Sequence, residues 1–117
     1  MRVLLVEDEP DEARSMQLVL EGEGYEVTLA RDGKEALDKV YGHDVVVLDI
    51  ILPRLNGDVV LKELRKRGNK ARVVVVTAVS REVGVEADLR KISRDIAFLQ
   101  KPFSSSDLIA AVSGKSK

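Results

Sequence analysis

The sequence predicts an α/β protein built on a doubly wound, five-stranded parallel sheet with helices on both faces. The first observation is a set of short apolar runs, at residues 3–6, 45–48 and 73–76, each closed by a polar residue. Runs of four apolar residues are too short for helices and are typical of strands buried on both faces. The second observation is that amphipathic helical patterns separate these runs. Strands that alternate with helices favour parallel pairing through right-handed crossovers.

The first strand, residues 3–6, leads into an acidic turn and a helix. Asp8 or Glu9 can cap this helix, and Pro10 suits its first turn, where the missing N–H has no partner to lose. Gly22 and Gly24 indicate where the helix ends. The apolar residues predicted to face inward are Ala13, Met16, Val19 and Leu20.

Residues 25–30 alternate apolar and polar side chains, as a half-buried edge strand does. Asp32 and Gly33 then turn the chain into a second helix. The central strand occupies residues 44–49 and ends at Asp49. A third helix opens at 56–58 and closes with the basic turn 65–67 before Gly68, because cations and glycine favour a helix C-terminus. Inward residues of these helices are Ala36, Leu37, Val40, Val60, Leu61 and Leu64.

The remaining elements follow the same alternation. Residues 73–76 form a buried strand that ends at Thr77, and residues 81–93 form a weaker helix because Gly84 interrupts a thin apolar stripe. A short strand at 96–99, a turn at 101–103 and a helix at 106–112 complete the chain. We expect one domain over residues 1–113 and a frayed tail at 114–117.

Composition narrows the function classes. With 44% hydrophobic and 33% charged residues in 117, the chain is globular rather than disordered. Its 19 basic and 20 acidic residues leave a net charge of -1, so no global field favours nucleic acid or an anionic membrane. The absence of cysteine excludes disulfides, thiolate metal sites and a cysteine nucleophile. The N-terminus has no apolar core of signal-peptide length, and no apolar run approaches the roughly 20 residues of a membrane span, so we expect a cytoplasmic protein.

Polar side chains of complementary chemistry follow the predicted strands. Parallel strands bring their carboxyl ends to one edge of the sheet, and here Glu7, Asp8, Asp49, Thr77 and Lys101 would meet. Three carboxylates repel one another unless a cation lies among them, and oxygen ligands favour Mg²⁺. A backbone carbonyl just after Asp49 can supply one more ligand. The Asp49 carboxylate can act as a nucleophile and form an aspartyl phosphate, while the Lys101 ammonium and the Thr77 hydroxyl bind phosphoryl oxygens.

Five segments carry a resemblance to a known family. They are Val3-Leu4-Leu5-Val6-Glu7-Asp8-Glu9, Val47-Leu48-Asp49-Ile50-Ile51-Leu52-Pro53, Asn56-Gly57, Val76-Thr77-Ala78 and Leu99-Gln100-Lys101-Pro102-Phe103. In this order they resemble the receiver domain of two-component response regulators, and the match covers nearly the whole chain. The resemblance implies the flavodoxin-like strand order 2-1-3-4-5. It also implies a cis Lys101-Pro102 bond.

The resemblance assigns a function to the strand ends. It implies that Asp49 accepts phosphate from the phosphohistidine of a histidine kinase or phosphotransfer protein, with Mg²⁺ as cofactor, and that Thr77 and Lys101 contact the phosphoryl group. The residues implied for the ion are Asp8, Asp49, the Ile51 carbonyl and, through water, Glu7. Such a regulatory domain catalyses its own phosphorylation and slow dephosphorylation rather than turning over a substrate. Ile51 and Val79, two residues beyond Asp49 and Thr77, are apolar, which predicts slow hydrolysis.

The resemblance also implies a switch and docking surfaces. Phe98 holds the position of the family's switch aromatic, usually tyrosine, and has no hydroxyl to hydrogen-bond. The expected switch moves Thr77 toward the phosphoryl group, turns Phe98 inward and reshapes the surface of the fourth helix, fifth strand and fifth helix, through which a homodimer can form. The family docks its kinase on the outward face of the first helix, here Asp11, Ser15 and Leu18. No direct contact of this domain with nucleic acid or a membrane is expected.

Three features depart from the family pattern. Glu7 stands where many receivers have aspartate, residues 93–97 lack the usual Gly-Ala pair, and the helix at 81–93 is weak. Two other functions stay open. One is an interaction module that works without phosphorylation, which a failure to bind Mg²⁺ would favour. The other is a flavin-binding electron carrier, which the 3% aromatic content and the acidic first loop disfavour.

Overall fold

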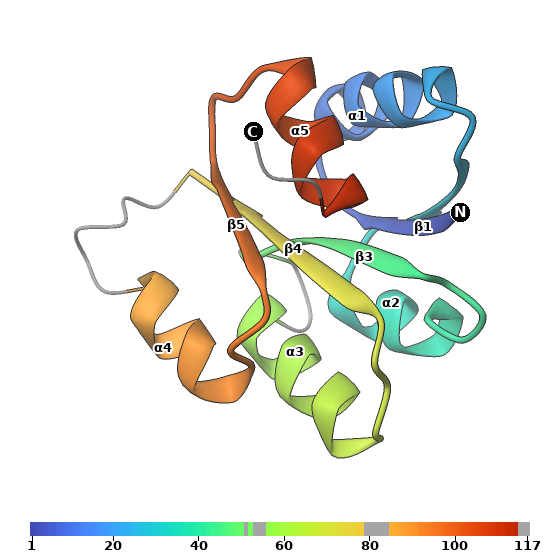
Figure 1. The fold of residues 1–117 in the computed structure, drawn as a ribbon. Coiled ribbons are helices and arrows are strands. Elements are labelled where there is room, and N and C mark those ends of the chain that lie inside the picture. The colour runs from blue at the N-terminus through green and yellow to red at the C-terminus, as the bar shows by residue number, and fades with distance from the viewer. Residues whose placement is uncertain (51, 53–55, 79–84, 115–117) are drawn as a thin grey trace.

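The computed structural model describes residues 1–50, 52, 56–78 and 85–114 (Figure 1). Five strands alternate with five helices among these residues. The strands are β1 (Arg2–Val6), β2 (Glu26–Ala30), β3 (Val45–Asp49), β4 (Arg72–Thr77) and β5 (Ala97–Gln100). The helices are α1 (Pro10–Gly22), α2 (Gly33–Lys39), α3 (Gly57–Lys66), α4 (Val85–Ile92) and α5 (Ser105–Ser113).

The strands form one parallel sheet in the order β2-β1-β3-β4-β5, which confirms the predicted fold class and strand order. The strand β3 lies at the centre between β1 and β4, and all five of its residues are buried. Its register aligns Leu48 with Val6 on one side and Asp49 with Val76 on the other. Asp49 therefore ends the central strand, where its backbone is fixed on both sides.

Helices cover both faces of the sheet, with α1 and α5 on one face and α2, α3 and α4 on the other (Figure 1). Alternate residues of each strand point to opposite faces because the side-chain period of a strand is two. Val46 and Leu48 of β3 accordingly pack with the core beneath α3, whereas Val45 and Val47 pack with Leu20 of α1. Both cores are built mainly from aliphatic side chains, which explains how a chain with few aromatic residues forms two apolar layers.

The predicted edge strand and the fourth helix are the elements on which the sequence was least informative. Val27 and Leu29 of β2 pack against the α1 face, and Thr28 between them is half-buried, with its hydroxyl 2.9 Å from Nε2 of His43. His43 lies in the loop between α2 and β3. The helix α4 lies inside the predicted range 81–93, and residues 81–84 lie outside the described residues, as do residues 115–117 of the predicted tail.

Capping decides between the two acids that precede α1. The side chain of Glu9, and not that of Asp8, accepts hydrogen bonds from the backbone N–H groups of Asp11 and Glu12. A side-chain oxygen at this position satisfies helix donors that would otherwise lack partners. Because Glu9 caps the helix, the Asp8 side chain can take another role at the carboxyl edge of the sheet, beside Glu7 and Asp49.

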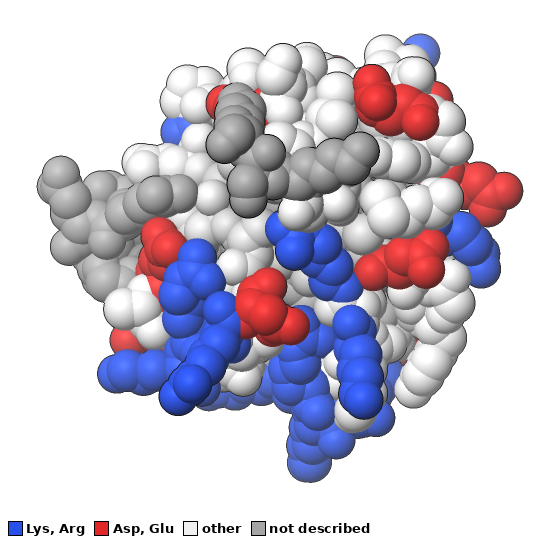
Figure 2. Space-filling model, in the orientation of Figure 1, with Lys and Arg blue, Asp and Glu red and all other residues white. Residues whose placement is uncertain are grey.

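Charged residues are unevenly distributed over the surface, although the net charge is only -1. Lys and Arg side chains gather on the lower part of the face in Figure 2, around the ends of α3 and α4. Exposed basic residues there are Lys66, Arg67, Lys70, Lys91 and Arg94. The carboxyl ends of helices face the amino edge of a parallel sheet, so this basic region lies away from the acidic edge.

Candidate functional site at the carboxyl edge of the sheet

The carboxyl edge of the sheet brings three acids together. Carboxylate oxygens of Glu7, Asp8 and Asp49 all lie within 4.8 Å of one another. Glu7 and Asp49 are buried, while Asp8 is exposed. Glu7 extends β1 by one residue, because its backbone N–H donates to the carbonyl of Ala30 at 3.0 Å. The acidic cluster predicted from the sequence is therefore present, with one side open to solvent.

Lys101 supplies the positive charge of this cluster. Its Nζ donates to Oε1 of Glu7 at 2.9 Å and to Oδ2 of Asp49 at 3.0 Å. The backbone fixes Lys101 as well, because its N–H donates to the carbonyl of Thr77 at 2.8 Å, and the predicted cis Lys101-Pro102 bond is confirmed. The ammonium thus reaches the acids from the far side of β4.

Burial and neighbouring charges shift the protonation of two of these groups. Burial raises the pKa of Glu7 to about 7; the hydrogen bond from Lys101 opposes this rise, and the charge of Asp49 adds to it. Burial by itself would lower the pKa of Lys101, but the carboxylates that accept its hydrogen bonds raise that pKa overall. Lys101 is therefore a permanent cation, whereas Glu7 keeps its proton to a higher pH than an ordinary carboxyl group does.

The set of oxygen donors fits a hard divalent cation. The described residues of the cluster offer carboxylate oxygens on a partly open face, and Mg²⁺ prefers such oxygens together with water. Burial is the main cause of the raised pKa of Glu7 and the charge of Asp49 adds to it, so a further cation beside Glu7 would favour its ionised form. Ile51, whose carbonyl was predicted to complete this set, and Val79 both lie outside the described residues.

A fourth acid, Glu12, belongs to the site and was missed from the sequence. Its Oε2 accepts a hydrogen bond from Nζ of Lys101 at 2.8 Å, and this bond lowers the pKa of Glu12. Glu12 lies in the first turn of α1, which begins at the same edge of the sheet. That placement was the available indication, since a helix that starts at the carboxyl edge directs its first turn toward the site.

Gly57 is a second residue whose contact was missed: the sequence placed it at the start of a helix and in a family motif, but not against the end of the central strand. Its N–H donates to the carbonyl of Ile50 at 2.8 Å. A Cβ atom built on Gly57 would come within 2.8 Å of the Ile50 Cα and closer still to the carbonyl oxygen of Asp49. Only glycine lets α3 approach the end of β3 this closely.

Thr77 and Phe98, the predicted switch residues, lie on neighbouring strands β4 and β5. Thr77 ends β4 and is fully buried. Phe98 is 7% exposed and packs in the core beneath α3 and α4, with Leu89 and Ile96. The ring therefore occupies an inward arrangement.

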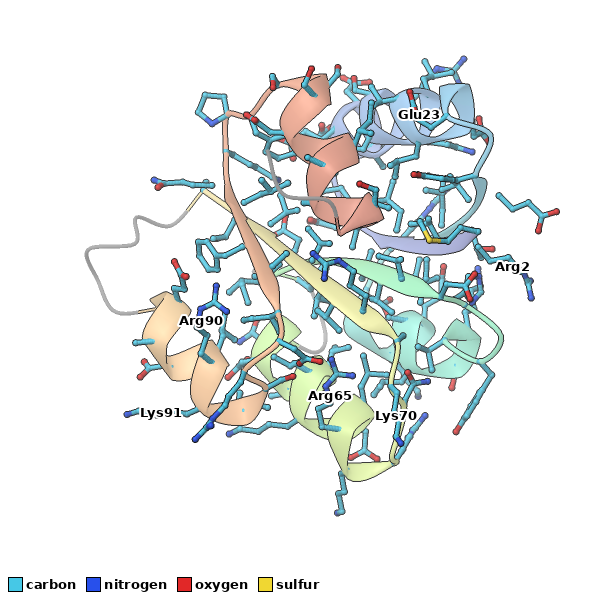
Figure 3. The ribbon with its side chains drawn as sticks, in the orientation of Figure 1. Arg2, Glu23, Arg65, Lys70, Arg90 and Lys91 are labelled. Atoms are coloured by element: carbon cyan, nitrogen blue, oxygen red, sulfur yellow. The ribbon has the colours of Figure 1, made fainter. Side chains whose placement is uncertain are left out.

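Two arginines tie α3 and α4 to the turn before β5 (Figure 3). Arg65 donates from Nε to Oγ of Ser93 at 2.9 Å, and from Nη1 to the carbonyls of Asn69 and Ala71. Arg90 donates from Nη1 to the carbonyl of Ile96 at 2.9 Å. The surface predicted to switch is thus joined by side-chain hydrogen bonds to two helices.

The predicted docking residues are accessible. Asp11 and Ser15 are exposed on α1, and Leu18 is 57% exposed. Asp11 and Ser15 also line a cleft of about 580 Å³ that Lys101 and Phe103 border from the other side. This cleft is a route from the α1 surface to the ammonium. No helix among the described residues is long and apolar enough to cross a membrane.

Comparison with known proteins shows a match to one protein family. The family profile described as the response regulator receiver domain matches residues 3–113. Among curated proteins, the uncharacterized transcriptional regulatory protein YkoG of Bacillus subtilis is 38% identical over 112 residues, which cover 94% of this chain and 48% of that protein. The transcriptional regulatory protein DltR of Streptococcus agalactiae is 36% identical over 114 residues, 96% of this chain and 50% of that protein. The chain spans about half the length of these relatives.

Solved structures give the same match. The receiver domain of the Francisella response regulator 1452 superimposes with a TM-score of 0.85 at 34% identity, over 96% of this chain and 93% of that one. The response regulator TrrA of Thermotoga maritima, in complex with Mg²⁺ and BeF, gives a TM-score of 0.84 at 31% identity, over 97% of this chain and 96% of that one.

Proposed function

The chain belongs to the response regulator receiver domain family, and from this premise we propose that it is a phosphoacceptor that takes a phosphoryl group onto Asp49. The donor would be the phosphohistidine of a histidine kinase or phosphotransfer protein. One observation carries the proposal: the ammonium of Lys101 lies 3.0 Å from the Asp49 carboxylate, inside a cluster with two further acids. A nucleophilic carboxylate, acids for a metal and a cation for the phosphoryl group are the parts that phosphoryl transfer needs.

Receiver domains bind Mg²⁺, and the residues here fit that ion. Glu7, Asp8, Asp49 and the Ile51 carbonyl would hold it, Glu7 through water. When bound, Mg²⁺ would neutralise carboxylate charge and polarise the phosphoryl group. The raised pKa of Glu7 supports this assignment, because a bound divalent cation would stabilise the ionised carboxylate that burial disfavours.

The chain's own residues would perform the transfer as follows. A carboxylate oxygen of Asp49 forms a bond to phosphorus while the bond between phosphorus and the histidine nitrogen breaks, and that nitrogen keeps the electron pair. Lys101 donates hydrogen bonds to the phosphoryl oxygens, and the Thr77 hydroxyl donates another. Only the phosphoryl group is transferred, so the protein needs only to position the reactants and compensate their charge.

The proposed output is a change at the surface of α4, β5 and α5. The Thr77 hydroxyl would move toward the phosphoryl group and favour the inward arrangement of Phe98, at the expense of an outward alternative. Arg65 and Arg90, which hold the turn before β5, would carry this shift to α3 and α4. A homodimer through this surface is the proposed consequence, and docking of the kinase through Asp11, Ser15 and Leu18 is the proposed input.

The test is phosphorylation by a small donor. Incubation with Mg²⁺ and acetyl phosphate should add one phosphoryl group to the intact chain, detected by mass spectrometry. Asp49→Asn should take up none, while Asp38→Asn, which removes an exposed carboxylate from α2, should behave like the natural chain. A phosphoryl group on Asp49→Asn would contradict the assignment of Asp49 as the acceptor. A natural chain that fails to bind Mg²⁺ would favour an interaction module independent of phosphorylation.

A further inference from the structure

Glu12 holds Lys101 with the shortest of three hydrogen bonds. The distances from Nζ are 2.8 Å to Glu12, 2.9 Å to Glu7 and 3.0 Å to Asp49. An ammonium group has three hydrogens to donate, so these three carboxylates saturate it. A phosphoryl oxygen can therefore receive a hydrogen bond from Lys101 only if one carboxylate gives up its own.

The free-energy cost of losing the hydrogen bond to Lys101 differs among the three carboxylates. The side chain of Glu7 is 1% exposed and that of Asp49 is 11% exposed, whereas the side chain of Glu12 is 47% exposed. A buried carboxylate that loses its partner keeps a large desolvation penalty, while an exposed one is rehydrated. The bond to Glu12 is consequently the one that breaks at least cost.

Glu12 also lies where an incoming donor would pass. It lines the cleft of about 580 Å³ that leads from the α1 surface to Lys101, together with Asp11 and the apolar side chains of Met16 and Phe103. With Glu12 the site holds four carboxylates and one ammonium, three of the carboxylates in contact with it, and the added charge repels an anion in the cleft.

We propose that Glu12 is a positioning residue that keeps Lys101 away from the phosphoryl group and thereby slows phosphorylation of the chain by small anionic donors. This inference rests on the proposed function of Asp49. Glu12 competes with the phosphoryl group for one cation, so the chain discriminates against free anions until Glu12 releases Lys101. A partner that neutralises Glu12 on docking would lift this restraint.

The test compares Glu12→Gln with the natural chain in two binding measurements of opposite expected sign. Beryllofluoride, a stand-in for the phosphoryl group, should bind about two- to fivefold more tightly to Glu12→Gln at saturating Mg²⁺, the range expected for one partly exposed charge. Mg²⁺ alone should bind up to about twofold more weakly, because a nearby negative charge is gone. Structural damage would weaken both. Glu23→Gln, at the other end of α1 (Figure 3), should change neither.

Two further readouts decide the inference. The initial rate with acetyl phosphate should rise in Glu12→Gln by about the same two- to fivefold factor. The ammonium hydrogens of Lys101, followed by ¹⁵N NMR, should exchange with water faster in Glu12→Gln. If the natural chain binds beryllofluoride and Glu12→Gln binds it with the same affinity, or shows the same exchange rate at Lys101, the role of Glu12 is refuted while the proposed function stands. A natural chain that takes up neither beryllofluoride nor phosphate refutes the proposed function, and this inference with it.

Discussion

The Nζ atom of Lys101 lies 3.0 Å from Oδ2 of Asp49, although 52 positions separate the two residues in the chain. Two crossovers and two strands intervene, and parallel pairing of β3 with β4 and of β4 with β5 aligns their carboxyl ends. The contact therefore exists only in the folded sheet. It gives the proposed phosphoacceptor a fixed counter-charge and makes Lys101 the residue that connects the acids to the cleft beside α1.

Loss of Lys101 should impair both phosphorylation and stability. Lys101→Ala leaves Glu7 and Asp49 buried without their cation, and we expect the free energy of unfolding without metal to fall by about 1–3 kcal/mol. Uptake of a proton by Glu7 limits this cost. Urea unfolding with and without Mg²⁺ measures it, and Mg²⁺ should restore part of the loss. A variant as stable as the natural chain without metal would contradict the charge balance described for the site.

Stability without metal should depend on pH through Glu7. Its pKa rises from an ordinary 4.5 to about 7 on folding, so the folded chain binds more protons than the unfolded chain between these values. The contribution of Glu7 to stability is therefore full below about pH 4.5 and is lost as the pH rises toward about 7. Thermal unfolding across this range should show the decline, and saturating Mg²⁺ should flatten it. Glu7→Gln should remove this component, and a decline that persists in Glu7→Gln would assign it to another group.

Gly57→Ala should disturb the end of the central strand. The added methyl group would press on the backbone of Asp49 and Ile50, which cannot yield as a flexible side chain can. We expect a loss of about 1–3 kcal/mol in the free energy of unfolding and slower phosphorylation of Asp49. Gly22→Ala is the matched control, because a Cβ there meets nothing within 4 Å and alanine favours the helix. Equal effects of the two substitutions would argue against the close approach as the cause.

The lifetime of the proposed aspartyl phosphate should depend on the side chains of Ile51 and Val79, which lie outside the described residues. Ile51 and Val79 are apolar, and we propose that they hinder the water that hydrolyses the phosphoryl group. Ile51→Asn and Val79→Glu should each accelerate loss of phosphate, measured as decay of the phosphorylated mass after removal of the donor. Unchanged decay in both variants would count against the proposal.

Phe98 should contribute far more to stability than the other phenylalanine. Phe98 is buried beneath α3 and α4, whereas Phe103 is half-exposed beside the cleft. Phe98→Ala removes a packed ring and leaves a cavity, which typically costs about 3–5 kcal/mol. Phe103→Ala should cost clearly less in the same urea titration. A reversed order would mean that the inward arrangement of Phe98 is not the dominant one.

The elements of the fold could be predicted because each depends on local sequence. The apolar runs at 45–48 and 73–76 predict buried strands, because they are short, rich in β-branched valine and each closed by a polar residue. The end of α3 follows from its basic last turn before Gly68. The order of the strands came from the resemblance to receiver domains, and so did the proposal that Asp49 accepts phosphate from a phosphohistidine.

Local sequence specifies the strands and helices, and it places polar side chains after the strands, namely Glu7, Asp8, Asp49, Thr77 and Lys101. The packing of separate elements is what brings Glu12 to Lys101 beside the other acids and leaves no room for a side chain at Gly57 against the backbone of Asp49. The physical reason is that strand and helix preferences are set by neighbouring residues. A hydrogen bond between α1 and the end of β5, or the absence of room for one methyl group, depends on how separate elements pack, and no local pattern encodes that distance.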